Sequence, residues 1–146
     1  MASVCGALTN LAQGGTVTSS NPNGPPEDMT KAFDGQSSTK WFTGVATAWI
    51  AYEFAGATTH VVTSYAITSA NDSPDRDPSG WTFQGSTDAV AWTTLDSRGG
   101  EVFATRFQTK GYSCANTTAY PRYRLTILAN SGATSLQLAE LQLFGN

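Results

Sequence analysis

Charge is scarce in this chain of 146 residues, because only 13% of its residues are charged, about half the share in an average protein. Eight residues are Lys or Arg and the formal net charge is -3, so the sequence gives no support for the basic stripe that a nucleic-acid site needs. No apolar run approaches the roughly 20 residues that cross a bilayer. We therefore expect neither a nucleic-acid partner nor membrane insertion.

Histidine and cysteine are also scarce. The one histidine, His60, has no nucleophile-elbow motif beside it, and the acidic residues cluster in loops, so we expect no enzyme. Cys5 and Cys114 lie in neither a CxxC motif nor a Cys/His cluster, which gives zinc binding and redox catalysis little support. A disulfide between the two cysteines and two buried free thiols are both open.

The first ten residues, MASVCGALTN, lack the basic leader and the apolar run of a secretory signal. A leaderless protein and a chain whose signal has been removed would look the same. The compartment therefore stays open, with action outside the cell as our expectation.

Short apolar runs bounded by Gly, Pro, Asn and Ser predict one all-β domain over residues 1–146. Alternation with period two is clear in several runs; for example, Ile50, Tyr52 and Phe54 share one face of a strand. Large aromatic side chains in such runs usually fill a sandwich core, so we expect most of the four tryptophans to be structural. The candidate strands are residues 14–20, 48–54, 60–70, 81–86, 90–96, 101–108, 120–128 and 136–144.

The segment AFDGQSSTKW, residues 32–41, places oxygen-bearing side chains at spacings that suit a hard cation. Asp34, Gln36 and Thr39 occupy positions one, three and six of a loop, and Gly35 can take a positive φ at its turn. This pattern predicts half of a calcium-type site.

The last apolar run, LQLAELQLF at residues 136–144, offers the other half. Its leucines change phase between Leu138 and Leu141, which predicts a β-bulge at Ala139 and Glu140. The bulge would turn Glu140 toward the same ion, whereas the alternative is a glutamate that simply faces solvent.

Five segments stand in an order that closely resembles the discoidin or coagulation factor 5/8 type C domain, and within it the family 32 carbohydrate-binding modules. They are KAFDGQSSTKW, AWIAYEF, YAITSANDSPDRDPSGWTFQGSTDAVAWTTLD, YRLTI and LQLAELQLFG. The resemblance runs from about Asn10 to Gly145. It implies an eight-stranded antiparallel jelly-roll β-sandwich with one structural calcium ion and a shallow sugar site in loops at one end.

The resemblance also implies the metal ligands. They are backbone carbonyls of Lys31, Gln36, Thr39 and Ala139, the Thr39 hydroxyl, and the carboxylates of Asp34 and Glu140. Two carboxylates among seven oxygens suit Ca²⁺ better than Mg²⁺, which wants a tighter octahedron and several waters. We also expect Trp41 to pack beneath this loop.

The sugar site transfers less completely. Galactose-binding relatives often use a His directly after the loop Trp and an Arg in the loop after the next long strand, where this chain has Phe42 and Asn71. We expect Asp and Arg to bind hydroxyls while an aromatic ring covers a pyranose. The alternative for Arg76 is an ion pair with Asp77 inside the loop, and we expect Phe103 to be exposed because its loop is rich in glycine. The candidate ligand residues are Phe42, Asn71, Asp75, Arg76, Asp77, Phe103 and Arg106.

The sequence thus predicts a calcium-stabilised carbohydrate-binding domain, either a lectin or a module of a larger enzyme, with glycans, galactose-type sugars among them, as partners. The alternative is a discoidin-type domain that binds protein or phospholipid without sugar specificity. A free-standing lectin with one shallow site would gain avidity as a homo-oligomer.

Overall fold

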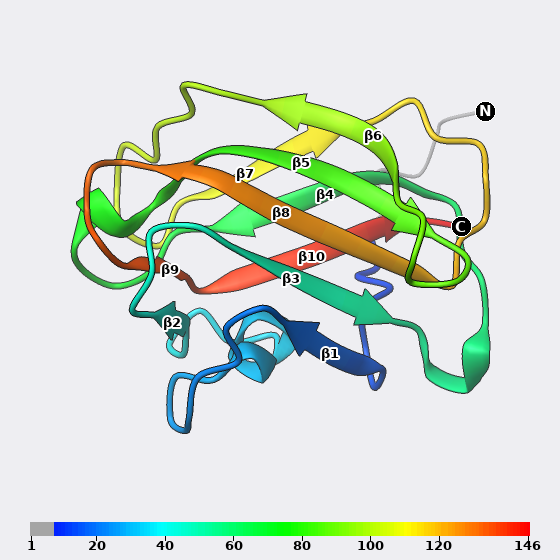
Figure 1. Cartoon of the computed structure of the whole chain (residues 1–146), viewed down its shortest axis with the longest axis horizontal. Helices are drawn as coiled ribbons and strands as arrows, with labels where there is room; N and C mark the ends of the chain where they lie inside the picture. Colours follow the sequence, from blue (N-terminus) through cyan, green and yellow to red (C-terminus); the bar gives the residue numbers. More distant parts are fainter. Residues whose placement is uncertain (1–7) are drawn as a thin grey trace.

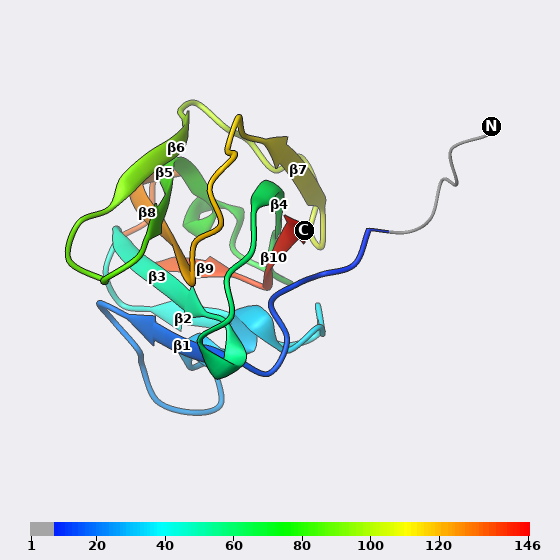
Figure 2. The same cartoon turned by 90° about the vertical axis from the view of Figure 1, so that its right-hand side faces the viewer.

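The computed structural model describes residues 8–146 and shows an all-β sandwich, as the sequence predicts (Figure 1). Hydrogen bonds join the strands into a five-stranded sheet, β1-β3-β8-β5-β6, a three-stranded sheet, β10-β4-β7, and the pair β2-β9. Figure 2 shows the larger sheet curving around one side of the molecule while β10, β4 and β7 close the other. The strands are β1 (Thr16–Ser19), β2 (Trp41–Thr43), β3 (Ala48–Glu53), β4 (Val62–Thr68), β5 (Pro78–Ser86), β6 (Thr93–Arg98), β7 (Thr109–Ser113), β8 (Arg122–Asn130), β9 (Leu136–Leu138) and β10 (Glu140–Gly145).

Three short 3-10 helices lie in the connections: η1 (Met29–Phe33), η2 (Ala55–Ala57) and η3 (Pro74–Arg76). None of the helices in the described part of the chain has the length and apolar character needed to cross a membrane.

Cys5 lies outside the described residues, and with it the proposed pairing to Cys114. The Cys114 thiol donates to the Val62 carbonyl at 3.5 Å, and burial raises its pKa.

Period-two alternation builds the core. In the antiparallel pair β3 and β8, Ile50 faces Leu125 and Tyr52 faces Tyr123, and all four side chains are buried. The inward side chains of the two layers meet there, because sandwich strands bury every second residue. Trp41 and Trp81 are buried as predicted, whereas Trp49 and Trp92 are partly exposed.

The strands differ from the sequence-based prediction, which has eight where residues 8–146 form ten. Residues 101–108 form a loop rather than a strand, and the pairing strand is β7, which follows at Thr109–Ser113. The apolar residues of 101–108 resemble a strand in sequence, but Phe103 reaches the core from a loop. The short β2, Trp41–Thr43, pairs with β9 and was not predicted.

The last apolar run breaks at Ala139. β9 pairs with β2 whereas β10 pairs with β4, so the phase change of the leucines marks a switch of partner strand rather than the bulge that we predicted. The backbone N–H of Ala139 donates to the Thr68 carbonyl at 2.9 Å. Glu140 opens β10 with only 4% of its surface exposed, so the solvent-facing alternative for this residue is wrong.

Candidate functional site

The predicted metal loop follows η1 at the edge of the sandwich. Asp28 caps η1, since its carboxylate accepts from the Thr30 N–H at 2.9 Å. The helix buries Ala32 and Phe33, and Asp34 is its C-cap residue. Gly35 then takes a φ of +72°, as the sequence predicts, and this turn points its N–H toward the last strand.

The loop and the last strand meet through two carboxylates. Glu140 accepts from the N–H groups of Gly35 and Gln36, both at 3.2 Å. Asp34 accepts from the Gln36 N–H at 2.9 Å and from the Thr39 hydroxyl. The structure thus brings Asp34, Gln36, Thr39 and Glu140 together from opposite ends of the sequence. Lys31 and Ala139 are placed beside the group by the chain, three residues before Asp34 and one before Glu140.

A buried carboxylate, Glu140, that faces a partly exposed one, Asp34, is costly without a cation. Burial, and then the neighbouring Asp34 carboxylate, raise the pKa of Glu140 to about 9. Burial also acts on Asp34, but hydrogen bonds from Glu140, Thr39 and Gln36 outweigh it and lower its pKa. Within residues 8–146, neither carboxylate has an ion pair and no third His, Cys, Asp or Glu joins them. Hydroxyl and carbonyl oxygens would therefore complete a metal site, and this all-oxygen donor set fits a calcium ion.

A polar pocket of about 300 Å³ lies against the metal loop. Lys40, the residue after Thr39, binds the Asp72 carboxylate at 2.9 Å and approaches Glu27 at 3.8 Å. Gln137 fixes the backbone of Asp72. Its side chain is fully buried, and its amide donates to the Asp72 carbonyl at 2.6 Å. The pocket is lined by Pro26, Glu27, Ser38, Thr39, Lys40, Asn71 and Asp72.

Of these residues, the sequence predicts Asn71 as a sugar ligand and Thr39 as a metal ligand. Lys40, Asp72 and Gln137 were missed. The available signal for Lys40 was its position, a single cation directly after the metal motif in a chain poor in charge.

Asp77 and Arg106 form a bidentate ion pair, with Nη1–Oδ1 at 2.9 Å and Nη2–Oδ2 at 2.5 Å. Asp77 is only 1% exposed, and Arg106 also donates to the carbonyls of Ala70 and Asp72. The pair therefore joins two loops. Asp77 also lines a pocket of about 320 Å³ together with Asp75 and Phe103, so its role as a ligand residue stays a prediction. The alternative of an Arg76–Asp77 ion pair is also wrong, because Arg106 takes that place.

Arg76 instead lies over the ring of Phe42, with its guanidinium carbon 5.0 Å from the ring centroid. This stack joins η3 to β2 at the loop end of the sandwich. Asn71 and Asp75 are exposed beside it. Phe42 and Arg76 are half-buried, and the role of these four residues in sugar binding stays a prediction.

The prediction for Phe103 is wrong. It is 4% exposed and packs in the core, with the Lys110 ammonium 5.2 Å from its ring centroid, so the expectation of an exposed ring is wrong. The exposed aromatic residue of this loop is Phe107, at 50%, which has a φ of +59° and donates its N–H to Ala70 at 3.4 Å. The sequence could not separate the two, because both lie in the same alternating run.

No family model matches the chain. Its sequence is 34% identical over 142 residues to a peptide-N(4)-(N-acetyl-β-glucosaminyl)asparagine amidase from Arabidopsis thaliana, a match that covers 92% of this chain. The chain spans only 20% of the length of that relative.

Solved structures identify the fold. The module CpGH89CBM32-5 from Clostridium perfringens, in complex with GalNAc-β-1,3-galactose, superposes with a TM-score of 0.80 at 17% identity, over 94% of this chain and all of that chain. An F5/8 type C domain from Bacteroides fragilis gives 0.77 at 14% identity, over 91% and 92% of the two chains. The chain therefore has the fold of the family 32 carbohydrate-binding modules and the F5/8 type C domains, as its sequence predicts.

Proposed function

We propose that this domain binds glycans through the loops at one end of its sandwich and that a calcium ion between Asp34 and Glu140 stabilises those loops. One observation carries the proposal: the polar pocket is built on the metal loop itself. Thr39 contacts Asp34 on one side, while the adjacent Lys40 lines the pocket on the other. Whatever fixes the loop also fixes the wall of the pocket.

The pocket offers the chemistry that a sugar needs. The Lys40 ammonium donates, the Asp72 carboxylate accepts, and the exposed Asn71 amide does both. The backbone N–H of Phe107 donates to the carbonyl of Ala70, the residue before Asn71, and Phe107 is 50% exposed. A pyranose has one apolar face and a polar rim, and an exposed ring on the neighbouring loop suits the apolar face.

Calcium, when bound, would supply the positive charge that the two carboxylates lack. Asp34, Thr39 and Glu140 would hold it through side-chain oxygens, with backbone oxygens of Lys31, Gln36, Thr39 and Ala139 as the further ligands. The protein's own contribution is to hold these groups on a turn that is already closed by the Gly35 and Gln36 N–H groups.

A binding role within a larger protein fits the comparisons best. The Clostridium module of the same fold is found with a galactose-containing disaccharide, and the Arabidopsis relative is, by name, an amidase of glycosylated asparagine. In this proposal the domain recognises the glycan, with galactose-type sugars among its ligands, and leaves catalysis to other parts of a longer chain. Protein or phospholipid binding through the exposed Phe107 and Val102 is the competing function.

A glycan array on the calcium-loaded protein tests the proposal, with liposome sedimentation beside it. We expect glycan binding that Lys40→Ala and Asn71→Ala reduce, while Lys110→Ala, which removes an ion-paired lysine outside the pocket, leaves it intact. Binding to liposomes without any glycan signal would overturn it.

Differential scanning calorimetry with and without EDTA tests the metal. We expect chelation to lower the melting temperature of the wild type and to have no effect on Asp34→Ala. An unchanged chelator response in this variant would refute the calcium assignment and leave the glycan proposal standing.

A further inference from the structure

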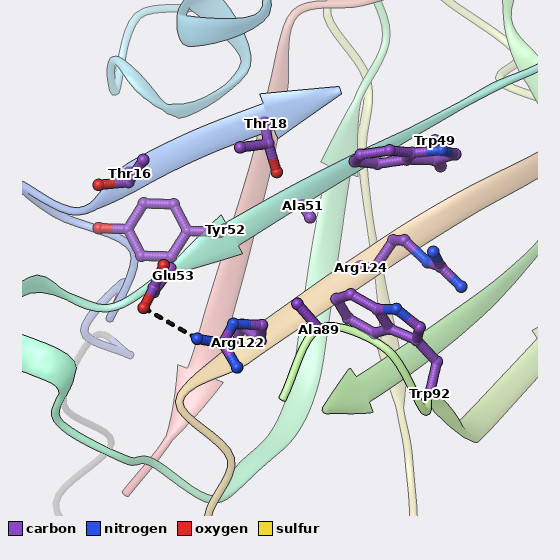
Figure 3. Close-up of a pocket in the computed structure, with 10 residues that line it drawn as sticks. All are labelled: Thr16, Thr18, Trp49, Ala51, Tyr52, Glu53, Ala89, Trp92, Arg122 and Arg124. Atoms are coloured by element: carbon purple, nitrogen blue, oxygen red, sulfur yellow. Dashed lines mark hydrogen bonds and ion pairs between the residues drawn. The ribbon is translucent and has the colours of Figure 1, made fainter. Parts of the chain in front are cut away.

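A second pocket, of about 210 Å³, lies on the outer face of the five-stranded sheet and shares no lining residue with the polar pocket of the loops (Figure 3). Its floor is Ala51 in β3, whose neighbours across the ladder are Thr18 in β1 and Arg124 in β8. Because alanine has only a methyl group, the sheet is hollowed where larger residues surround it. Glu53 and Arg122 close one end of the pocket.

Two partly exposed tryptophans flank the hollow. The Arg124 guanidinium carbon lies 4.1 Å from the ring centroid of Trp92 and 5.7 Å from that of Trp49. Figure 3 shows Arg124 between the two indoles, with Trp92 reaching over from the β5–β6 turn. Indole faces on an outer surface are otherwise an unfavourable exposure of apolar area, so their presence around a hollow indicates a contact surface.

The turn that carries Trp92 is held firmly in place. The Asp88 carboxylate accepts from the N–H groups of Val90 and Ala91 at 2.9 and 3.0 Å, and the Ser86 hydroxyl accepts from the N–H of Ala89 at 2.9 Å. Ala89 has a φ of +63°, a conformation that costs free energy for a residue with a Cβ. The wall of the pocket is thus organised before any ligand arrives.

The two arginines of the pocket differ in their partners. Arg122 is satisfied, since it binds the Glu53 carboxylate at 3.0 Å and the Thr87 carbonyl at 2.7 Å. Arg124 uses only its Nε, which donates to Gln84 at 2.9 Å. Within residues 8–146 its two terminal nitrogens have no hydrogen-bond acceptor and no carboxylate partner. Burial accordingly lowers the pKa of Arg124.

We propose that this pocket binds a carboxylated pyranose, such as a uronic acid residue, with its carboxylate against the terminal Nη1 and Nη2 edge of the Arg124 guanidinium. The planar fork of an arginine matches a carboxylate through two parallel hydrogen bonds. In this proposal the apolar face of the pyranose ring packs against the Trp49 indole, above Ala51. The Thr18 hydroxyl, which points toward Ala51, binds a hydroxyl of the sugar ring.

Charge and size select this occupant. Two arginines against one glutamate leave the pocket with one net positive charge in a chain whose net charge is -3, so an anion is favoured here. The enclosed volume suits one sugar ring rather than a folded partner, and its walls are aromatic rather than the flat apolar face of a protein interface. The inference does not depend on the proposed loop site.

Tryptophan indole N–H signals in a ¹⁵N–¹H NMR titration of the whole chain test the proposal directly. The Trp49 and Trp92 signals report the pocket. Trp41 and Trp81 are internal controls, because both are buried and donate to Asn21 and Tyr65. We expect galacturonate and glucuronate to shift the first two signals and leave the others in place, while galactose and glucose at the same concentration shift neither pair.

Variants separate binding from loss of fold. We expect Arg124→Gln to weaken uronate binding about tenfold or more, as the loss of a charge-assisted pair predicts. Ala51→Leu should abolish binding by filling the hollow. Arg98→Gln is the matched control, since Arg98 also stacks on a ring, that of Tyr112 at 5.0 Å, but is paired with Asp96. Equal shifts with neutral sugars, no shift with either uronate, or full binding by Arg124→Gln would overturn the proposal.

Discussion

Arg106 is the group on which the loops of the candidate glycan site depend most. Its guanidinium pairs with Asp77 through two bonds and also donates to the carbonyls of Ala70 and Asp72, so it joins its own loop to the 70–77 segment. The Asp77 carbonyl in turn accepts from the N–H of Ser131 at 3.0 Å. Removing this one side chain should therefore loosen three loops at once.

The cost of Arg106→Ala follows from burial. The Asp77 side chain is 2% exposed, so the variant leaves a carboxylate buried without its cation, and such a loss costs about 3 to 5 kcal/mol. Because 22% of the Arg106 side chain is exposed, water would reach part of the gap. We therefore expect the lower end, a fall in the free energy of unfolding of about 3 kcal/mol.

Urea denaturation followed by tryptophan fluorescence measures this change. Arg76→Ala is the matched control, since Arg76 only stacks on Phe42 at the surface and its removal should cost less than about 1 kcal/mol. The double variant Arg106→Ala with Asp77→Ala should recover part of the loss, because it removes the buried charge as well. A loss below about 1 kcal/mol in Arg106→Ala would refute the reasoning, since it would mean that water solvates Asp77 in the folded state.

Two further predictions concern the same loops. Phe107→Gly should raise the free energy of unfolding by about 1 kcal/mol in thermal melts, because it relieves a positive φ, and yet weaken binding on the glycan array; unchanged glycan binding would remove Phe107 from the site. Hydrogen bonds from Lys40 and then Gln137 lower the pKa of Asp72 below 3.8, so its stabilisation is present above that pH and is lost as the pH falls through the folded-state value. Urea melts between about pH 5 and about pH 3 should show a smaller loss of stability for Asp72→Asn than for the wild type, and equal losses would contradict this.

The sequence predicted the parts of the structure that follow from local periodicity. Alternation of apolar residues identified β3 and β8 and their inward faces. The phase change in the last run located the irregularity at Ala139, but its nature, a switch of partner strand rather than a bulge, was not predicted. The sequence also predicts that Asp34 and Glu140 lie close together, as the structure shows. Their role as calcium ligands remains a prediction.

The parts that failed depend on contacts between segments far apart in the chain. Phe103 and Phe107 lie in one run, and only the packing of the loop decides that the first is buried. The partner of Asp77 is 29 residues away, so the neighbouring Arg76 seemed a natural choice from sequence. The aromatic pocket combines Trp49 from β3 with Trp92 from a hairpin turn, and no spacing along the chain relates them.

Because the chain has few charged residues, the partner of each basic residue can be stated. Of eight Lys and Arg residues, five form ion pairs within residues 8–146: Lys40, Arg98, Arg106, Lys110 and Arg122. Arg76 lies on Phe42 at the loop surface, and Lys31 belongs to η1, next to the predicted metal loop. Arg124 alone stands between two indoles on a sheet face, where burial opposes its charge and no carboxylate compensates it. Its two terminal nitrogens have no acceptor within residues 8–146, and they are the donors that the proposed carboxylated ligand would use.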